Sequence, residues 1–186
     1  MTDQSERRGL IPSKSYLFNY RTPKGFADLV MRSDGEALTG LWFKGSPGAG
    51  KHTQEGLAKE LPVFRETSAW LDGYFAGQPP AKPPHLRIEG LTAFRRDVIA
   101  ELRGIPYGET RSYGEIAARL ARRKGRAHMS AQAVGGAVGW NPICILVPCH
   151  RVIGQDGSMI GYGGGLANKI ALLRHERRHA EAPPAS

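Results

Sequence analysis

Residues 143–152 read ICILVPCHRV, and this stretch carries the candidate reactive group of the chain. The apolar run Ile143–Val147 has the length and branching of a buried strand, which the following proline would end. Cys149, His150 and Arg151 come next. A thiol becomes a strong nucleophile when a nearby base or positive charge favours its thiolate. Beside Cys149, His150 supplies a candidate base and Arg151 a positive charge. The stretch therefore predicts a nucleophilic cysteine at the end of a strand. The alternative is an inert buried cysteine beside a surface His-Arg pair.

The composition indicates a globular protein with a polyanionic partner. The chain has 186 residues, 40% of them hydrophobic, which allows one full domain or two small domains with a buried core. No apolar run is long enough to cross a membrane, and the N-terminal sequence MTDQSERRGL lacks the apolar core of a signal peptide. The formal net charge of +9 favours a nucleic acid or an acidic lipid surface as partner.

The two cysteines indicate the compartment. Cys144 and Cys149 are five positions apart, and on one strand their side chains would point to opposite faces. We therefore expect both thiols to be free, and the protein to be cytoplasmic, associated with the nucleoid if it is bacterial. No set of Cys and His has the spacing of a structural zinc site. We expect neither a metal nor another cofactor.

The first half of the chain reads as a small mixed α/β unit. Strands are predicted over Ser15–Tyr20, Phe26–Arg32 and Ala37–Lys44, separated by turn-rich segments. Aromatic and aliphatic residues at helical spacing predict a helix over Phe64–Phe75. Gln78–Gly90 contains four prolines and is expected to be an extended connector. This division predicts an N-terminal domain, connector included, over residues 1–90.

The second half reads as mainly helical, over residues 91–178, with a disordered tail over 179–186. Four helices are predicted: Thr92–Arg103, Tyr113–Arg123, Ser130–Val138 and Ala167–Arg177. A glycine-rich loop, Gly161–Gly165, precedes the last of them.

Two of these helices, Tyr113–Arg123 and Ser130–Val138, form a candidate helix-turn-helix. The second is unusual because it consists almost entirely of small residues, with Gly135 and Gly136 side by side. Each glycine costs about 1 kcal/mol of helix propensity. A helix that reads the major groove usually presents longer polar side chains, whereas small residues allow close approach to a narrow groove. The alternative is tight packing between helices with no role in DNA binding.

Motifs along nearly the whole chain resemble the O6-alkylguanine-DNA alkyltransferases, repair proteins that take an alkyl group from guanine onto their own cysteine. The most specific motif is Pro148–Val152, which follows Asn141-Pro142-Ile143. The others are Leu41–Gly45, Lys51-His52, Leu71–Phe75, Ile105–Thr110, Ser112–Ala117, Ala133–Ala137 and Gly161–Leu166. The resemblance implies an α/β (α+β) fold class. It implies a ribonuclease H-like N-terminal domain and a mainly helical C-terminal domain that carries the helix-turn-helix and the active site.

The resemblance also implies the catalytic roles. Cys149 would be the alkyl acceptor and would act once per chain, because the thioether product is not reversed. Adjacent side chains diverge, so a water molecule is expected to carry the proton from Cys149 to His150. Glu176 matches the glutamate that orients this imidazole, and Tyr113 matches the tyrosine whose hydroxyl reaches a ring nitrogen of the base. Asn141 is also expected to be a catalytic residue.

Binding to double-stranded DNA is implied as well. The target atom lies inside the duplex, so the nucleotide must be rotated out. The family does this from the minor groove, with an arginine that fills the vacated stack; here that position holds Gln132, which is shorter and uncharged. The preceding turn, Arg122–Met129, is basic and longer than the family's usual turn. It either contacts phosphates or supplies a side chain, Arg126 or His128, that fills the vacated stack in place of the arginine. The alternative is a solvated loop without such a role. The expected DNA contacts are Arg126, Ser130, Ala131, Gln132, Ala133, Gly135, Gly136 and Arg151. The expected substrate pocket is Trp140, Val152, Tyr162 and Gly163.

Other functions are less consistent with the sequence. Gly45–His52 nearly matches a phosphate-binding loop, but His52 stands where a hydroxyl should hold magnesium, so we expect no nucleotide partner. The main rival is a lesion-binding alkyltransferase-like protein, a class that lacks the acceptor cysteine which this chain has. A helix-turn-helix regulator is a third option, disfavoured by the Pro148–Val152 motif. We expect a monomer with no membrane partner.

Overall fold

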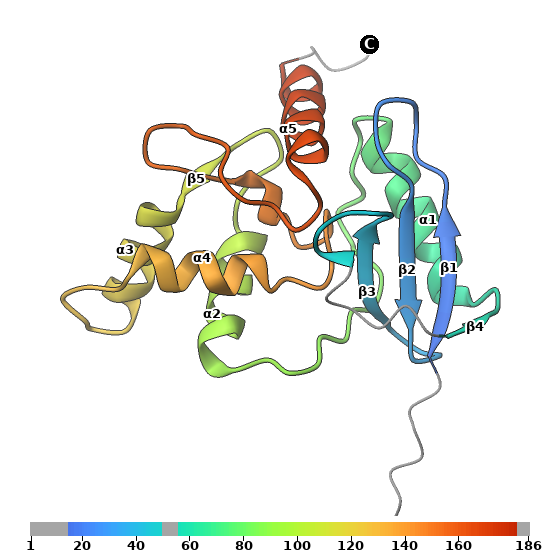
Figure 1. Cartoon of the computed structure of the whole chain (residues 1–186), viewed down its shortest axis with the longest axis horizontal. Helices are drawn as coiled ribbons and strands as arrows, with labels where there is room; N and C mark the ends of the chain where they lie inside the picture. Colours follow the sequence, from blue (N-terminus) through green and yellow to red (C-terminus); the bar gives the residue numbers. More distant parts are fainter. Residues whose placement is uncertain (1–14, 50–55, 182–186) are drawn as a thin grey trace, which may run out of the picture.

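The computed structural model describes residues 15–49 and 56–181, in which a mixed α/β half and a helical half lie side by side (Figure 1). The first half contains a sheet of order β3-β2-β1-β4. Strands β1 (Tyr16–Tyr20), β2 (Leu29–Ser33) and β3 (Leu38–Phe43) are antiparallel neighbours, and β4 (Leu57–Ala58) runs parallel to β1. The three strands expected from the sequence are present, with ends shifted by up to three residues.

Helix α1 (Pro62–Phe75) covers one face of this sheet and contacts β2 and β3. Its first residue is a proline, which fits the first helical turn because that turn needs no N–H there. The buried side chains Phe64, Leu71 and Tyr74 recur at helical spacing and form the face that packs on the sheet.

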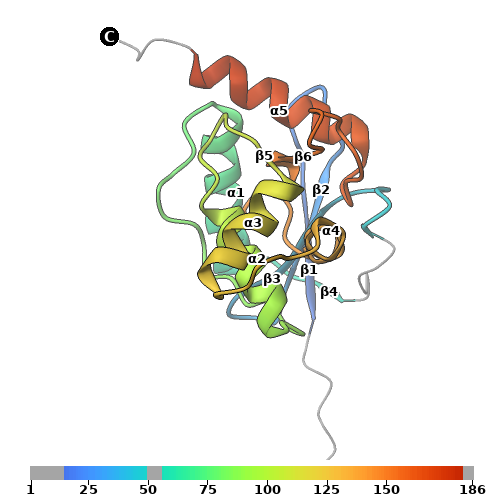
Figure 2. The ribbon, with the colours of Figure 1, turned by 90° about the vertical axis from the view of Figure 1, so that its left-hand side faces the viewer.

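The second half is built from helices with explicit N-terminal caps. Thr92 caps α2 (Ala93–Arg103), and Ser130 caps α4 (Ala131–Gly139), as their hydroxyl groups accept backbone N–H bonds from the first turn. Ser112 and Glu115 form a capping box at the start of α3 (Tyr113–Arg123). Figure 2 views this half from its outer side, with α5 (Leu166–Ala180) lying across the top. The predicted helices are therefore confirmed.

Edge contacts of β3 join the two halves. Leu38 forms a bridge with Leu86 in the connector, and Leu41 forms one with Ile143 in the second half. Two backbone bonds flank the latter: Leu41 N–H donates to Pro142 O (2.9 Å), and Cys144 N–H donates to Leu41 O (2.8 Å). The core is continuous across both halves, because Phe64 and Leu71 belong to the same buried cluster as Leu120 and Val147.

The predicted strand over Ile143–Val147 is wrong. The segment pairs with β3 only at Ile143 and then turns, with Ile145 at φ 66°, outside the β region. The physical cause is Asn141, whose amide group donates to Ile143 O (3.1 Å) and Val147 O (2.9 Å) and so replaces the hydrogen bonds of a strand ladder. The motif Pro148–Val152 therefore follows a buried turn and not a strand.

The predicted start of the tail is also wrong. Residues 179 and 180 belong to α5, and residue 181 caps it; residues 182–186 lie outside the described part of the chain. His179 extends the helix because its ring packs on His175, 4.4 Å between centroids, and bonds His175 O at 2.9 Å. No helix within residues 15–49 and 56–181 is long and apolar enough to cross a bilayer.

Candidate active site

Cys149 lines a cavity of about 420 Å³. It begins the 3-10 turn Cys149–Arg151, directly after the turn that Asn141 shapes, and its side chain is buried. The walls of the cavity come from α3, α4, the loop before α5 and, at Pro47, the loop after β3. The lining residues besides Cys149 are Pro47, Tyr113, Gly135, Val138, Gly139, Gly161, Tyr162 and Gly163.

Asn141 holds the sulfur atom of Cys149. Its Nδ2 atom lies 2.9 Å from Cys149 Sγ, and its Oδ1 accepts the Ile143 N–H at 3.1 Å. One amide therefore fixes both the turn and the sulfur atom of Cys149. A donor aimed at sulfur favours the thiolate over the thiol.

Cys144 contacts Cys149, which overturns the expectation that the two side chains point apart. That expectation assumed a strand, and the turn at Ile145 brings the thiols together. The hydrogen bond from Cys144 is the main cause that lowers the pKa of Cys149; burial opposes it, while Asn141 and the Lys169 charge add to it. The same hydrogen bond and burial raise the pKa of Cys144, so Cys144 stays a thiol and can donate. Both cysteines are free, as predicted.

Glu176 on α5 is fully buried and accepts hydrogen bonds from several elements. Oε1 lies 2.7 Å from His150 Nε2, and the Tyr74 hydroxyl of α1 donates to it at 2.7 Å. The Gly108 N–H donates to Oε2 at 3.1 Å. Burial opposes ionisation, but the hydrogen bonds and charges of His150 and Arg151 lower the pKa of Glu176 well below its ordinary range. The carboxylate is therefore ionised and accepts only.

The proton of His150 can be assigned from these contacts. Burial lowers the pKa of His150, outweighing Glu176, so the imidazole is neutral at neutral pH. Because ionised Glu176 can only accept, Nε2 must carry the hydrogen atom. Nδ1 is then the basic nitrogen, and it has no hydrogen-bond partner among the described residues. The ring is prepared to accept a proton on Nδ1.

Arg151 does not lie where the expected DNA contact requires. Its guanidinium is buried, with Nε 2.9 Å from Glu176 Oε2 and Nη2 3.0 Å from Glu176 Oε1, and Nη1 donates to Ile105 O at 2.7 Å. If Arg151 turned outward to bind a phosphate, the buried Glu176 carboxylate would lose its counter-charge, which costs several kcal/mol, on the order of 3–5. Arg151 therefore compensates the charge of Glu176 inside the fold.

Lys169 on α5 is a residue that sequence analysis missed. Its side chain is fully buried, and its Nζ donates to Val152 O (2.6 Å) and Ile160 O (3.1 Å). Burial lowers the pKa of Lys169, and the charge of Cys149 opposes this. The ammonium group is thus a cation close enough to interact with Cys149, and it also holds the loop before α5.

Two of the four expected pocket residues line the cavity, and two do not. Tyr162 and Gly163 are lining residues. Trp140 stacks instead under Arg95, whose guanidinium carbon is 4.1 Å from the ring centroid, because it leaves the end of α4 on the side of the connector. Val152 is fully buried in β6 (Val152–Ile153), which pairs with β5 (Arg111–Ser112).

Tyr113, at the start of α3, is another lining residue of the cavity. Its hydroxyl is 3.4 Å from Ile160 O. Burial first, and then the charge of Cys149, raise the pKa of Tyr113. The phenol is therefore protonated at neutral pH and can donate.

The outer face of α4 is exposed beside this cavity. Ala131, Gln132, Ala133 and Gly136 are exposed there with the capping Ser130, while Gly135 lines the cavity. The basic residues of the turn before α4 are exposed, and two of them, Arg123 and Lys124, form ion pairs with Asp97 of α2. Gln132 stands three positions before Gly135, a lining residue of the cavity, whereas Arg122, Arg126 and His128 line a separate hollow together with Ala131.

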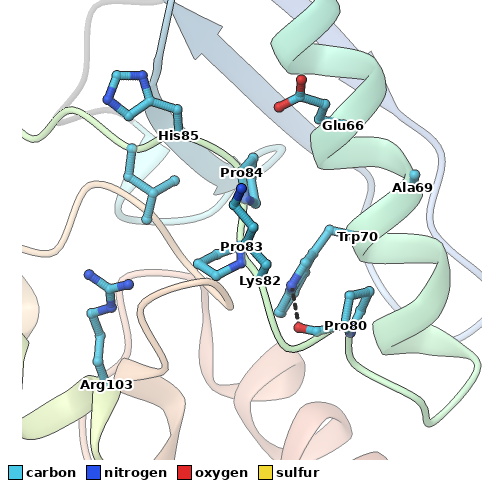
Figure 3. A pocket seen from close by; sticks show the side chains of 10 residues that line it. Glu66, Ala69, Trp70, Pro80, Lys82, Pro83, Pro84, His85 and Arg103 are labelled. Atoms are coloured by element: carbon cyan, nitrogen blue, oxygen red, sulfur yellow. Dashed lines mark hydrogen bonds between the residues drawn. The ribbon is translucent and has the colours of Figure 1, made fainter.

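A larger groove of about 870 Å³ lies between α1 and the connector (Figure 3). Its wall includes Trp70, whose indole N–H donates to Pro80 O at 3.0 Å, together with Lys82, His85 and Arg103. Cys149, His150 and Tyr113 do not line it. Within residues 15–49 and 56–181, no group of three or more His, Cys, Asp or Glu is arranged to hold a metal ion.

Comparisons with known proteins give one consistent result. A family model described as "6-O-methylguanine DNA methyltransferase, DNA binding domain" matches residues 93–178. A methylated-DNA–protein-cysteine methyltransferase of Haemophilus influenzae is 40% identical over 171 residues, covering 87% of this chain and 86% of its own. One from Mycolicibacterium paratuberculosis is 52% identical over 130 residues, covering 70% and 75%. The crystal structure of Mycobacterium tuberculosis OGT in complex with DNA superposes with a TM-score of 0.71 at 36% identity, covering 89% of this chain and 94% of that one.

Proposed function

The chain belongs to the methylated-DNA–protein-cysteine methyltransferase family, and we propose that it repairs DNA by moving an alkyl group from O6-alkylguanine to its own Cys149. The observation that carries this is the position of Cys149, in the lining of an open cavity with hydrogen-bond donors on its sulfur. The Cys149 thiolate attacks the alkyl carbon. A carbon–sulfur bond forms as the bond from carbon to O6 breaks, and the electron pair leaves with guanine. The thioether is stable, so each molecule acts once.

Proton movement follows from the assigned state of His150. Nδ1 accepts the Cys149 proton through a bridging water, and the resulting imidazolium is stabilised by Glu176. The departing guanine gains negative charge, which the protonated Tyr113 hydroxyl offsets by donating to a ring nitrogen. The contacts of Asn141 and Cys144 support a thiolate at Cys149, and Lys169 adds a nearby positive charge.

DNA is bound through the exposed face of α4, with α3 and α4 acting as a helix-turn-helix in the minor groove. The small residues Ala131, Ala133 and Gly136 support this role, because they let the helix backbone approach a narrow groove. The target base is rotated into the cavity, and Gln132 or a side chain of the basic turn fills the vacated stack. Arg122 and Arg126 neutralise phosphates, so binding weakens steeply with salt, by about 0.9 in the log–log slope per contact.

The remaining organisation is proposed from the family resemblance. Residues 1–90 form a ribonuclease H-like domain with its connector, residues 91–178 form the DNA-binding and acceptor domain, and the protein acts as a cytoplasmic monomer without a nucleotide. The order β3-β2-β1-β4 with α1 on one face is consistent with such an N-terminal domain.

The decisive experiment is intact-mass analysis after incubation with a duplex that contains one O6-methylguanine. The wild-type protein should become heavier by one CH2 unit, with the methyl group on Cys149 by peptide mapping. Cys149→Ser should bind the same duplex and remain unmodified. Stable binding by the wild-type protein without any gain in mass would identify a lesion-binding protein and refute the proposal.

A further inference from the structure

A loop from the N-terminal half closes one side of the Cys149 cavity. Gly45–Ala49 follows β3, and in both views of the ribbon it lies beside the loop that leads into α5 (Figures 1 and 2). Pro47 is a lining residue of the cavity. Among the described lining residues it alone comes from the part of the chain before the connector. The pocket is therefore completed from outside the domain that carries the chemistry.

The loop is anchored at both ends. Ser46 N–H donates to Phe43 O at 3.1 Å, and Ala49 N–H donates to Ser46 O at 3.0 Å. Ala49 is buried in a small cluster with Val30 and Trp42. Pro47 is thus presented on a short turn whose ends are fixed to the sheet, and its ring restricts the backbone further.

Gly48 binds the neighbouring loop that leads into α5, which also lines the cavity. Its N–H donates to Gly163 O at 2.6 Å. A Cβ atom on Gly48 would lie 2.7 Å from Gly163 O and 3.0 Å from Gly163 C, too close for any side chain. The partner loop is rich in glycine, with φ of 48° at Gly161 and 86° at Gly165, so it has little stiffness of its own. The bond from Gly48 holds this loop at Gly163, in addition to the bonds of Lys169 to Ile160 O and of Asn168 to Gly164 O.

We propose that Pro47, held in place by the Gly48–Gly163 contact, is a specificity-determining residue that limits the size of the alkyl group accepted by Cys149. This inference rests on the proposed function. At the moment of reaction the alkyl carbon lies about 3–3.5 Å from the attacking atom. Carbons beyond it must occupy whatever part of the 420 Å³ cavity the guanine leaves. Pro47 bounds that space.

The test compares two duplexes of the same sequence, one with O6-methylguanine and one with O6-butylguanine. The measured quantity is the ratio of the two second-order transfer rate constants, butyl over methyl. Pro47→Ala should raise this ratio about tenfold or more, the scale on which a pocket discriminates by one or a few methylene groups. Pro47→Trp should lower it. Pro62→Ala is the matched control, because Pro62 is an exposed proline at the start of α1 and does not line the cavity; its ratio should equal that of the wild type.

Gly48→Ala tests the contact itself. The added methyl group cannot coexist with the 2.6 Å bond, so the wall must move outward and the ratio should rise as it does for Pro47→Ala. Ratios that stay at the wild-type value in Pro47→Ala and Pro47→Trp would overturn the inference. Ratios that change equally in Pro62→Ala would also overturn it. Failure of every protein, wild type included, to transfer a methyl group would instead count against the proposed function.

Discussion

Replacement of Glu176 by alanine is expected to lower the free energy of unfolding by about 3–5 kcal/mol, the cost of leaving a buried charge without its partner. The fully buried carboxylate faces two hydrogen bonds from Arg151, at 2.9 and 3.0 Å, and one each from His150 and Tyr74 at 2.7 Å. Alanine would leave the Arg151 guanidinium in the interior with Ile105 O as hydrogen-bond acceptor and the Tyr107 ring beside it, but without a counter-charge from Glu176. A loss of this size is a large part of the 5–15 kcal/mol typical of a domain.

Two further variants isolate the charge from the shape. Glu176→Gln keeps the volume and one acceptor oxygen but turns an amide N–H2 toward donors, so it should cost more than about 1 kcal/mol and less than alanine. Glu109→Ala is the control, because Glu109 is an exposed carboxylate in the neighbouring turn; its effect should stay within about 0.5 kcal/mol.

The assay is urea unfolding followed by tryptophan fluorescence, with all four proteins at pH 7.5. The order of midpoints should be wild type and Glu109→Ala, then Glu176→Gln, then Glu176→Ala, at similar slopes. A Glu176→Ala protein within about 1 kcal/mol of the wild type would show that the interior is open to water around Arg151. That result would refute the buried-charge reasoning.

Three other outcomes are expected. Stability should fall as the pH drops below about 6.5, because burial lowers the pKa of His150 and the unfolded chain then binds more protons; the depressed pKa of Glu176 adds a further loss below about 4.3. Urea midpoints between pH 4 and 8 measure this, and a flat profile would contradict it. Cys144→Ala should slow methyl transfer most at low pH, because the Cys149 thiolate loses a donor; rate–pH profiles that coincide with the wild type would exclude this contact. Gln132→Arg should speed transfer from duplex DNA by lowering the activation free energy by up to about 1–3 kcal/mol, the scale of one stacked base. The rate of reaction with free O6-benzylguanine should not change. If neither rate changes, Arg126 or His128 is the side chain that holds the base out.

The helices were predictable because their signals are local. Thr92 and Ser130 cap helices whose first turns they satisfy directly, and glycine and proline mark the turns between them. The segment Ile143–Val147 was not predictable by such signals. Its branched residues favour a strand, but the side chain of Asn141 takes over its backbone hydrogen bonds, and this interaction depends on how the chain is packed.

The charged interior was the other feature that sequence could not supply. Lys169 and Glu176 belong to a helix rich in charge, for which a solvated face is the natural interpretation. Their burial is decided by distant partners, Val152 O for Lys169 and Tyr74 for Glu176. The expectation that Arg151 contacts DNA fails for the same reason. The sequence alone does not show which charged side chains pair in the interior.

The hydrogen bond from Tyr74 to Glu176 joins residues 102 positions apart, across the proline-rich connector. Together with Pro47 in the cavity wall, it makes each half of the molecule incomplete without the other. A chain divided within the connector would therefore behave as a two-fragment reporter. The fragment with Cys149 would react with a labelled benzylguanine only after the fragment with Tyr74 had bound to it. The label would then remain as a permanent record that the two fragments had met.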